Sequence, residues 1–71
     1  MKSIYLKTAR EKAGLTQEEL EAKSRVPQGV ISKLERNADV RPAFDTVVKL
    51  ADALKVDPRA LKFGQPELLA S

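Results

Sequence analysis

From Gln17 to Arg36 the chain reads Q-E-E-L-E-A-K-S-R-V-P-Q-G-V-I-S-K-L-E-R. The preceding Thr16 fits a capping box with Glu19, in which the hydroxyl and the carboxylate each cap the other residue's backbone N–H group. This pattern predicts a helix that runs to about Ser24 and a second helix that begins just after Pro27. About three residues join the two helices, which is the spacing of a helix-turn-helix.

The rest of the chain also carries helix signals. Apolar residues recur at intervals of three and four, and there is no alternating β-branched run, so we expect an all-α domain. Asn37 is a suitable left-handed stop for the helix that ends at Arg36. One of the other expected helices runs from an N-cap at Ser3 to Gly14, and another follows Pro42 with Phe44, Val47, Ala51 and Leu54 on one stripe. A last short helix is expected from the Asp57-Pro58 pair to about Gly64. The residues expected in the core of the last two helices are Phe44, Val47, Leu50, Ala51, Leu54 and Leu61.

The composition excludes several classes of function. The 71 residues include no cysteine and no histidine, so the usual zinc ligands and the commonest general base are missing. We therefore expect no enzyme, no metal site and no cofactor. The N-terminus lacks an apolar signal core and no apolar run is long enough to span a membrane, so we expect a cytoplasmic protein.

The positive charge is concentrated in the first half of the chain. Residues 1–37 contain eight basic and five acidic side chains, whereas the remaining residues contain five of each. The whole net charge of +3 therefore lies in the part of the chain that contains the two helices of the predicted helix-turn-helix. A basic excess of this kind favours a nucleic acid as the partner.

Several segments resemble the Cro and lambda-repressor type of helix-turn-helix regulators, also called the xenobiotic-response-element family. They occur in the family's order, from about Leu6 to Leu61. The resemblance implies a compact five-helix bundle in residues 1–64, whose third helix enters the DNA major groove. We expect residues 65–71 to be a short tail. The matching segments are L-T-Q-E-E-L at 15–20, V-P-Q-G-V-I-S-K-L-E-R at 26–36, R-P at 41–42 and K-L-A-D-A-L-K-V at 49–56.

Four positions depart from the family pattern. Arg25 stands where the turn is usually glycine, and it would have to adopt a left-handed backbone. Lys55 replaces the glycine that usually follows the fourth helix. Glu21 replaces a small residue, and Ser24 replaces an apolar one.

The third helix carries polar residues that could read base edges. A glutamine can bond to adenine N6 and N7, a lysine can donate to guanine O6 and N7, and a serine can serve either role. A glycine has no side chain to read a base, but it allows close backbone approach. A merely solvated helix face is the alternative interpretation. The candidate base-reading residues are Gln28, Gly29, Ser32, Lys33 and Arg36.

A second set of residues is expected near DNA phosphates. Thr16 and Gln17 stand at the start of a helix, where backbone N–H groups and the helix dipole favour an anion. Arg41 lies in the loop after the third helix and is interpreted as a phosphate clamp or as a solvated charge. Arg10 belongs to this set as well, although the resemblance implies that it forms an ion pair with Glu35 that orients the third helix.

Apolar residues near the C-terminus suggest self-association. Little of the domain remains to cover them, so we expect a homodimer contact at Leu61, Phe63, Leu68 and Leu69. The expected function is a dimeric repressor that reads a pseudo-palindromic operator in double-stranded DNA. The alternative is an antitoxin-like module that binds a toxin or another regulatory protein and autoregulates through the same domain.

Overall fold

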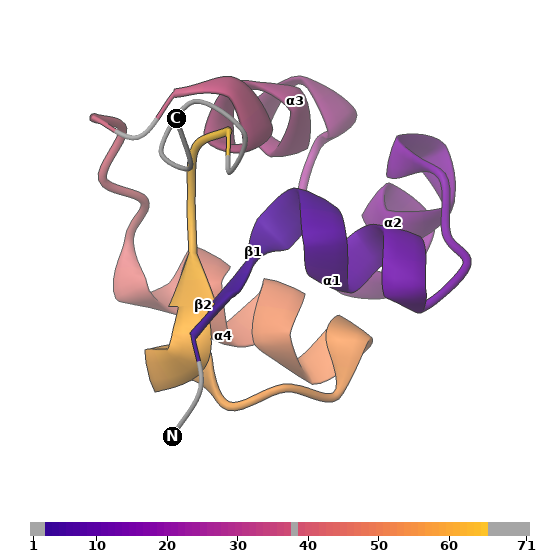
Figure 1. Cartoon of the computed structure of the whole chain (residues 1–71). Helices are drawn as coiled ribbons and strands as arrows, with labels where there is room; N and C mark the ends of the chain where they lie inside the picture. Colours follow the sequence, from indigo (N-terminus) through magenta and orange to yellow (C-terminus); the bar gives the residue numbers. More distant parts are fainter. Residues whose placement is uncertain (1–2, 38, 66–71) are drawn as a thin grey trace.

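The computed structural model describes residues 3–37 and 39–65. Within these residues the all-α class is confirmed, but the expected count of five helices is wrong. The predicted fifth helix is a single 3-10 turn, and a short parallel strand pair joins the two ends of the domain. The elements are β1 (Ile4–Tyr5), α1 (Leu6–Lys12), α2 (Gln17–Ser24), α3 (Gln28–Arg36), α4 (Phe44–Leu54), η1 (Pro58–Ala60) and β2 (Leu61–Lys62) (Figure 1).

The first helix begins later than the sequence predicts. Ile4 pairs with Leu61 and Tyr5 with Lys62, so the residues after Ser3 are extended rather than helical. Tyr5 is the N-cap of α1 and makes no side-chain cap hydrogen bond. At the other end, Gly14 adopts the predicted left-handed conformation with φ of 74°.

The capping box that begins α2 is present as predicted. The Glu19 backbone N–H donates to Thr16 Oγ1 at 3.1 Å, and the Thr16 N–H donates to Glu19 Oε1 at 2.8 Å. The helix ends at Ser24, and the φ of 65° at the following Arg25 confirms the predicted left-handed turn. Ser24 is buried, and its hydroxyl donates to the Leu20 carbonyl and accepts from the Val26 N–H. These two bonds satisfy a polar group where the family usually has an apolar one.

The end of α3 differs from the expectation. Asn37 has φ of −127°, so the predicted left-handed stop is wrong. Instead, its side-chain carbonyl accepts a hydrogen bond from the Asp39 N–H at 2.9 Å. An asparagine that bonds to the backbone two residues on makes a turn of its own, and Asn37 does so directly after the helix.

The segment after α4 includes the N-cap that its sequence predicts. Lys55 takes a left-handed φ of 57° in place of glycine. Asp57 caps η1 by accepting from the Arg59 N–H at 2.8 Å, and Pro58 is the first residue of that turn. The hydrogen bonds from Arg59, first of all the one from its backbone N–H, lower the pKa of the Asp57 carboxyl below its ordinary value.

The hydrophobic core is built from all four α-helices. Most of the core residues predicted from Phe44 onward are confirmed, and Val47 packs against the cluster. Phe44 is the exception: it is 75% exposed at the first position of α4, so its predicted place in the core is wrong. The largest fully buried side chains are Leu6, Leu20, Ile31, Leu34 and Leu50.

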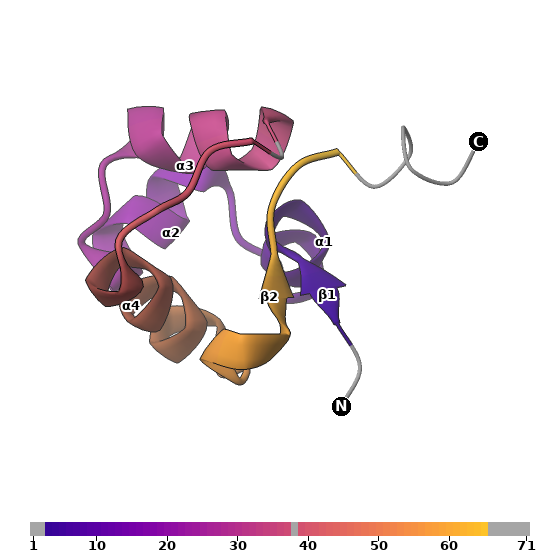
Figure 2. The ribbon, with the colours of Figure 1, turned by 90° about the vertical axis from the view of Figure 1, so that its left-hand side faces the viewer.

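The strand pair lies across the domain from α4 toward α3. In Figure 1, β2 begins beside α4 and the chain then rises to α3, which lies along the top. At that point the Gly64 N–H donates to the Leu34 carbonyl at 2.9 Å, so the end of the described chain is attached to α3 (Figure 2). Among the described helices, none has the length and apolar content needed to cross a membrane.

Candidate nucleic-acid interface

Helix α3 has one buried face and one exposed face. Ile31, Leu34 and Glu35 are buried against the rest of the domain. The residues predicted to read bases lie away from them. Ser32 is half-buried, and the exposed members of the predicted set are Gln28, Gly29, Lys33 and Arg36.

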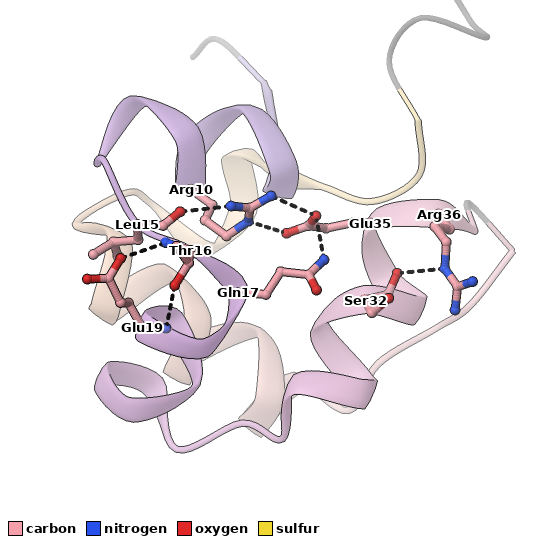
Figure 3. A network of polar contacts seen from close by, with 8 residues as sticks. All are labelled: Arg10, Leu15, Thr16, Gln17, Glu19, Ser32, Glu35 and Arg36. Atoms are coloured by element: carbon pink, nitrogen blue, oxygen red, sulfur yellow. Dashed lines mark hydrogen bonds and ion pairs between the residues drawn. The ribbon is translucent and has the colours of Figure 1, made fainter.

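Arg36 folds back along its own helix. Its Nε donates to the Ser32 carbonyl oxygen at 3.2 Å (Figure 3). This bond occupies one of the five guanidinium N–H groups, so the side chain can still donate to a ligand.

Glu35 is the centre of a buried polar network that joins three helices (Figure 3). Its carboxylate accepts from Arg10 Nε at 2.7 Å and from Arg10 Nη2 at 3.2 Å. Gln17 Nε2 donates to the same carboxylate at 3.0 Å. The side chains of Arg10 and Glu35 are only 12% and 4% exposed, so this ion pair is shielded from water. The ion pair that the resemblance implied is therefore confirmed.

The network places Arg10 inside the domain. Its Nη1 also donates to the Leu15 carbonyl at 2.7 Å, which ties α1 to the chain before α2. The hydrogen bond to the Glu35 carboxylate raises the pKa of Arg10 above its ordinary value. The guanidinium therefore positions α3, and this use competes with its expected contact to a phosphate.

A helix-turn-helix family model matches residues 6–61. The protein belongs to the Cro/lambda-repressor type of helix-turn-helix regulators. This match confirms the family that the sequence resembles, and it identifies the chain as a DNA-binding transcriptional regulator. Comparisons with curated proteins and with solved structures gave no match.

The start of α2 in this helix-turn-helix domain offers backbone groups rather than side chains. The Thr16 hydroxyl is used in the capping box, and the Gln17 amide is turned toward Glu35. The backbone N–H of Gln17 remains at the first position of the helix, where an anion is favoured. The sequence does not predict the contact between Gln17 and Glu35, because no local pattern relates residues so far apart.

The cations expected to meet DNA are accessible. Lys33 and Arg41 are both exposed. Neither side chain takes part in the hydrogen bonds or ion pairs formed among residues 3–37 and 39–65. Arg41 stands in the loop between α3 and α4, directly before the half-buried Pro42.

The residues expected in a dimer contact divide into three cases. Leu61 is 7% exposed and belongs to the core, so the reasoning that it lacks partners in its own subunit is wrong. Its pairing with Ile4 in the strand pair explains this burial. Phe63 is half-buried and packs against the core. Leu68 and Leu69 lie outside the described residues.

Proposed function

We propose that this helix-turn-helix protein is a dimeric repressor that reads a pseudo-palindromic operator through α3 in the major groove of double-stranded DNA. The observation that carries the proposal is the contrast on α3 between a buried Glu35, held by Arg10 and Gln17, and an exposed face with Gln28 and Lys33. A helix used for reading bases must be held rigidly and must present uncommitted polar groups to the groove.

The exposed side chains suit different bases. Gln28 can bond to both adenine N6 and N7, and Lys33 can donate to guanine O6 and N7. Ser32 can bond to either base. Arg36 extends the same face at the last turn of α3.

Gly29 supports this use of α3 in another way. A glycine inside a helix destabilises it by about 1 kcal/mol relative to alanine. Apart from its chain neighbours and the backbone of its own helix, a Cβ atom at Gly29 would meet no atom of the described domain within 4 Å, so packing within the domain does not require a glycine there. We propose that Gly29 lacks a side chain because α3 must approach the DNA closely at this position.

Phosphate contacts would fix the position of α3 in the groove. The backbone N–H of Gln17 at the start of α2 suits one phosphate, and Arg41 in the loop after α3 suits another. Because the Gln17 side chain bonds to Glu35, a phosphate bound at the start of α2 would be coupled directly to α3.

A second copy of the chain would complete the binding surface. One domain of this size buries too little DNA surface for tight and specific binding at physiological salt. Two copies related by a two-fold axis would place their recognition helices about 34 Å apart, which is one turn of the duplex. We assign the contact between the copies to Phe63, Leu68 and Leu69.

Selection of bound fragments from a random duplex pool tests the proposal, because it reveals the site, its symmetry and the half-site spacing together. We expect an inverted repeat with half-sites one helical turn apart, bound by two copies in sedimentation analysis. Recovery of no preferred sequence would contradict the base-reading function. Recovery of a single unrepeated site, bound by one copy, would leave base reading in place and remove the dimer.

A further inference from the structure

Val30, in the first turn of α3, is an exposed apolar residue that does not pack in the core of the domain. Its side chain is 38% exposed, whereas the neighbouring Ile31 and Leu34 are fully buried. Val30 is also absent from the apolar side chains that belong to the core cluster or pack against it. Burial in the described domain therefore does not explain an apolar, β-branched residue at this position.

Val30 lies at the edge of the face that is proposed to read bases. Successive residues of an α-helix are separated by about 100°, so Val30 projects beside Lys33, one turn further along. Beyond Lys33 on the same side lies Gly29, which has no side chain and faces open space, whereas the neighbour on the other side of Val30 is the buried Leu34. Val30 is the one apolar side chain of α3 that is exposed together with its polar residues.

The major groove offers one apolar group for such a side chain to meet. Thymine carries a C5-methyl group there, whereas the other three bases present hydrogen-bonding groups along their edges without a methyl. A valine against a polar base edge would remove water from that edge without replacing its hydrogen bonds. Against a thymine methyl, the same side chain would bury apolar surface on both partners.

We propose that Val30 is a specificity-determining residue, whose isopropyl group packs against the C5-methyl group of one thymine in each half-site. This inference rests on the proposed function, because it requires α3 to lie in the major groove. Val30 adds an apolar contact to a base-reading face that otherwise consists of hydrogen-bonding groups. The proposal predicts a preference for a T·A base pair next to the base pair that Lys33 contacts.

Deoxyuridine is a direct probe, because it differs from thymidine only by the missing methyl group. The selected operator is synthesised with each thymine of one half-site replaced in turn by deoxyuridine, and binding of the full chain is measured by fluorescence anisotropy. We expect the wild type to lose roughly fourfold in affinity at one position, as follows from one buried methyl group. In Val30→Ala the same replacement should change the affinity by much less.

Val48→Ala is the matched control, because Val48 is a half-buried valine on the different helix α4. It should keep the deoxyuridine profile of the wild type. Circular dichroism on heating verifies that both variants are folded at the assay temperature. If Val30→Ala keeps the wild-type profile, or if no thymine of the operator is sensitive in the wild type, the inference is overturned and the proposed function stands. A random pool that yields no operator would instead overturn both.

Discussion

The two ends of α3 differ in what their side chains touch. In the last turn, Glu35 is buried and accepts three hydrogen bonds from Arg10 and Gln17, which belong to two other helices. In the first turn, Gln28 and Val30 are exposed, and the Gln28 side chain makes none of the hydrogen bonds found within residues 3–37 and 39–65. The difference separates positioning from reading: the buried Glu35 holds the helix in the domain, and the exposed side chains are left for a ligand.

The largest expected effect follows from removing the anchor. Glu35→Ala leaves the Arg10 guanidinium in a shielded site without its carboxylate, and loss of one partner of a buried ion pair costs about 3 to 5 kcal/mol. We therefore expect the free energy of unfolding, measured by urea denaturation, to fall by about that amount. A small domain has little stability to lose, so the variant should be partly unfolded even without denaturant.

A double variant tests whether the unpaired charge is the cause. Arg10→Met with Glu35→Leu removes both charges and replaces them with apolar side chains, so it should recover most of the lost stability. If the double variant is as unstable as Glu35→Ala, the loss arises from something other than the stranded guanidinium.

The exposed face of α3 should respond in binding rather than in folding. Gln28→Ala and Lys33→Ala each remove a proposed contact to a base edge, so each should weaken operator binding by about 1 to 3 kcal/mol. Titration of the operator and of a random duplex measures the difference. The melting temperatures should stay close to that of the wild type, because both side chains are exposed. Equal losses on the two duplexes would mean that these residues contact DNA without reading a base, and no loss on either would make them an ordinary solvated surface.

Gly29→Ala should move stability and binding in opposite directions. Alanine favours the helix, and its Cβ meets open space, so we expect the fold to gain up to about 1 kcal/mol in urea denaturation. The same methyl group should weaken operator binding, because it fills the space assigned to close approach. A variant that gains stability without losing affinity would show that the glycine has no role at the DNA.

The smallest effect concerns Arg41, which extends the comparison to the loop after α3. A phosphate contact releases counterions but reads no base, so Arg41→Ala should weaken binding to all sequences alike. The slope of log affinity against log salt concentration should decrease by about one unit. Lys55→Ala serves as the matched control: it removes an exposed cation at the far end of α4 and should leave that slope unchanged. An unaltered slope in Arg41→Ala would make Arg41 a solvated charge.

Features that depend on a few neighbouring residues could be predicted from the sequence. The Thr16–Glu19 capping box, the left-handed Gly14 and the Asp57-Pro58 turn all form as expected, since their hydrogen bonds join residues no more than four apart. The left-handed Arg25 and the Arg10–Glu35 pair could be inferred only from the family resemblance, because the first is unfavourable locally and the second joins distant helices.

Features that depend on contacts between distant segments, such as the burial of a side chain, were decided by the tertiary structure. The sequence around Ile4 suits a helix, but pairing with Leu61 extends it and buries Leu61 in the core. Helical periodicity places Phe44 on the apolar stripe of α4, yet its side chain at the first position of that helix is left 75% exposed by the other described elements. On α3, only the packing against the rest of the domain buries Ile31 and leaves Val30 exposed. A helical pattern defines the direction of each side chain, whereas burial depends on distant segments that the local pattern does not specify.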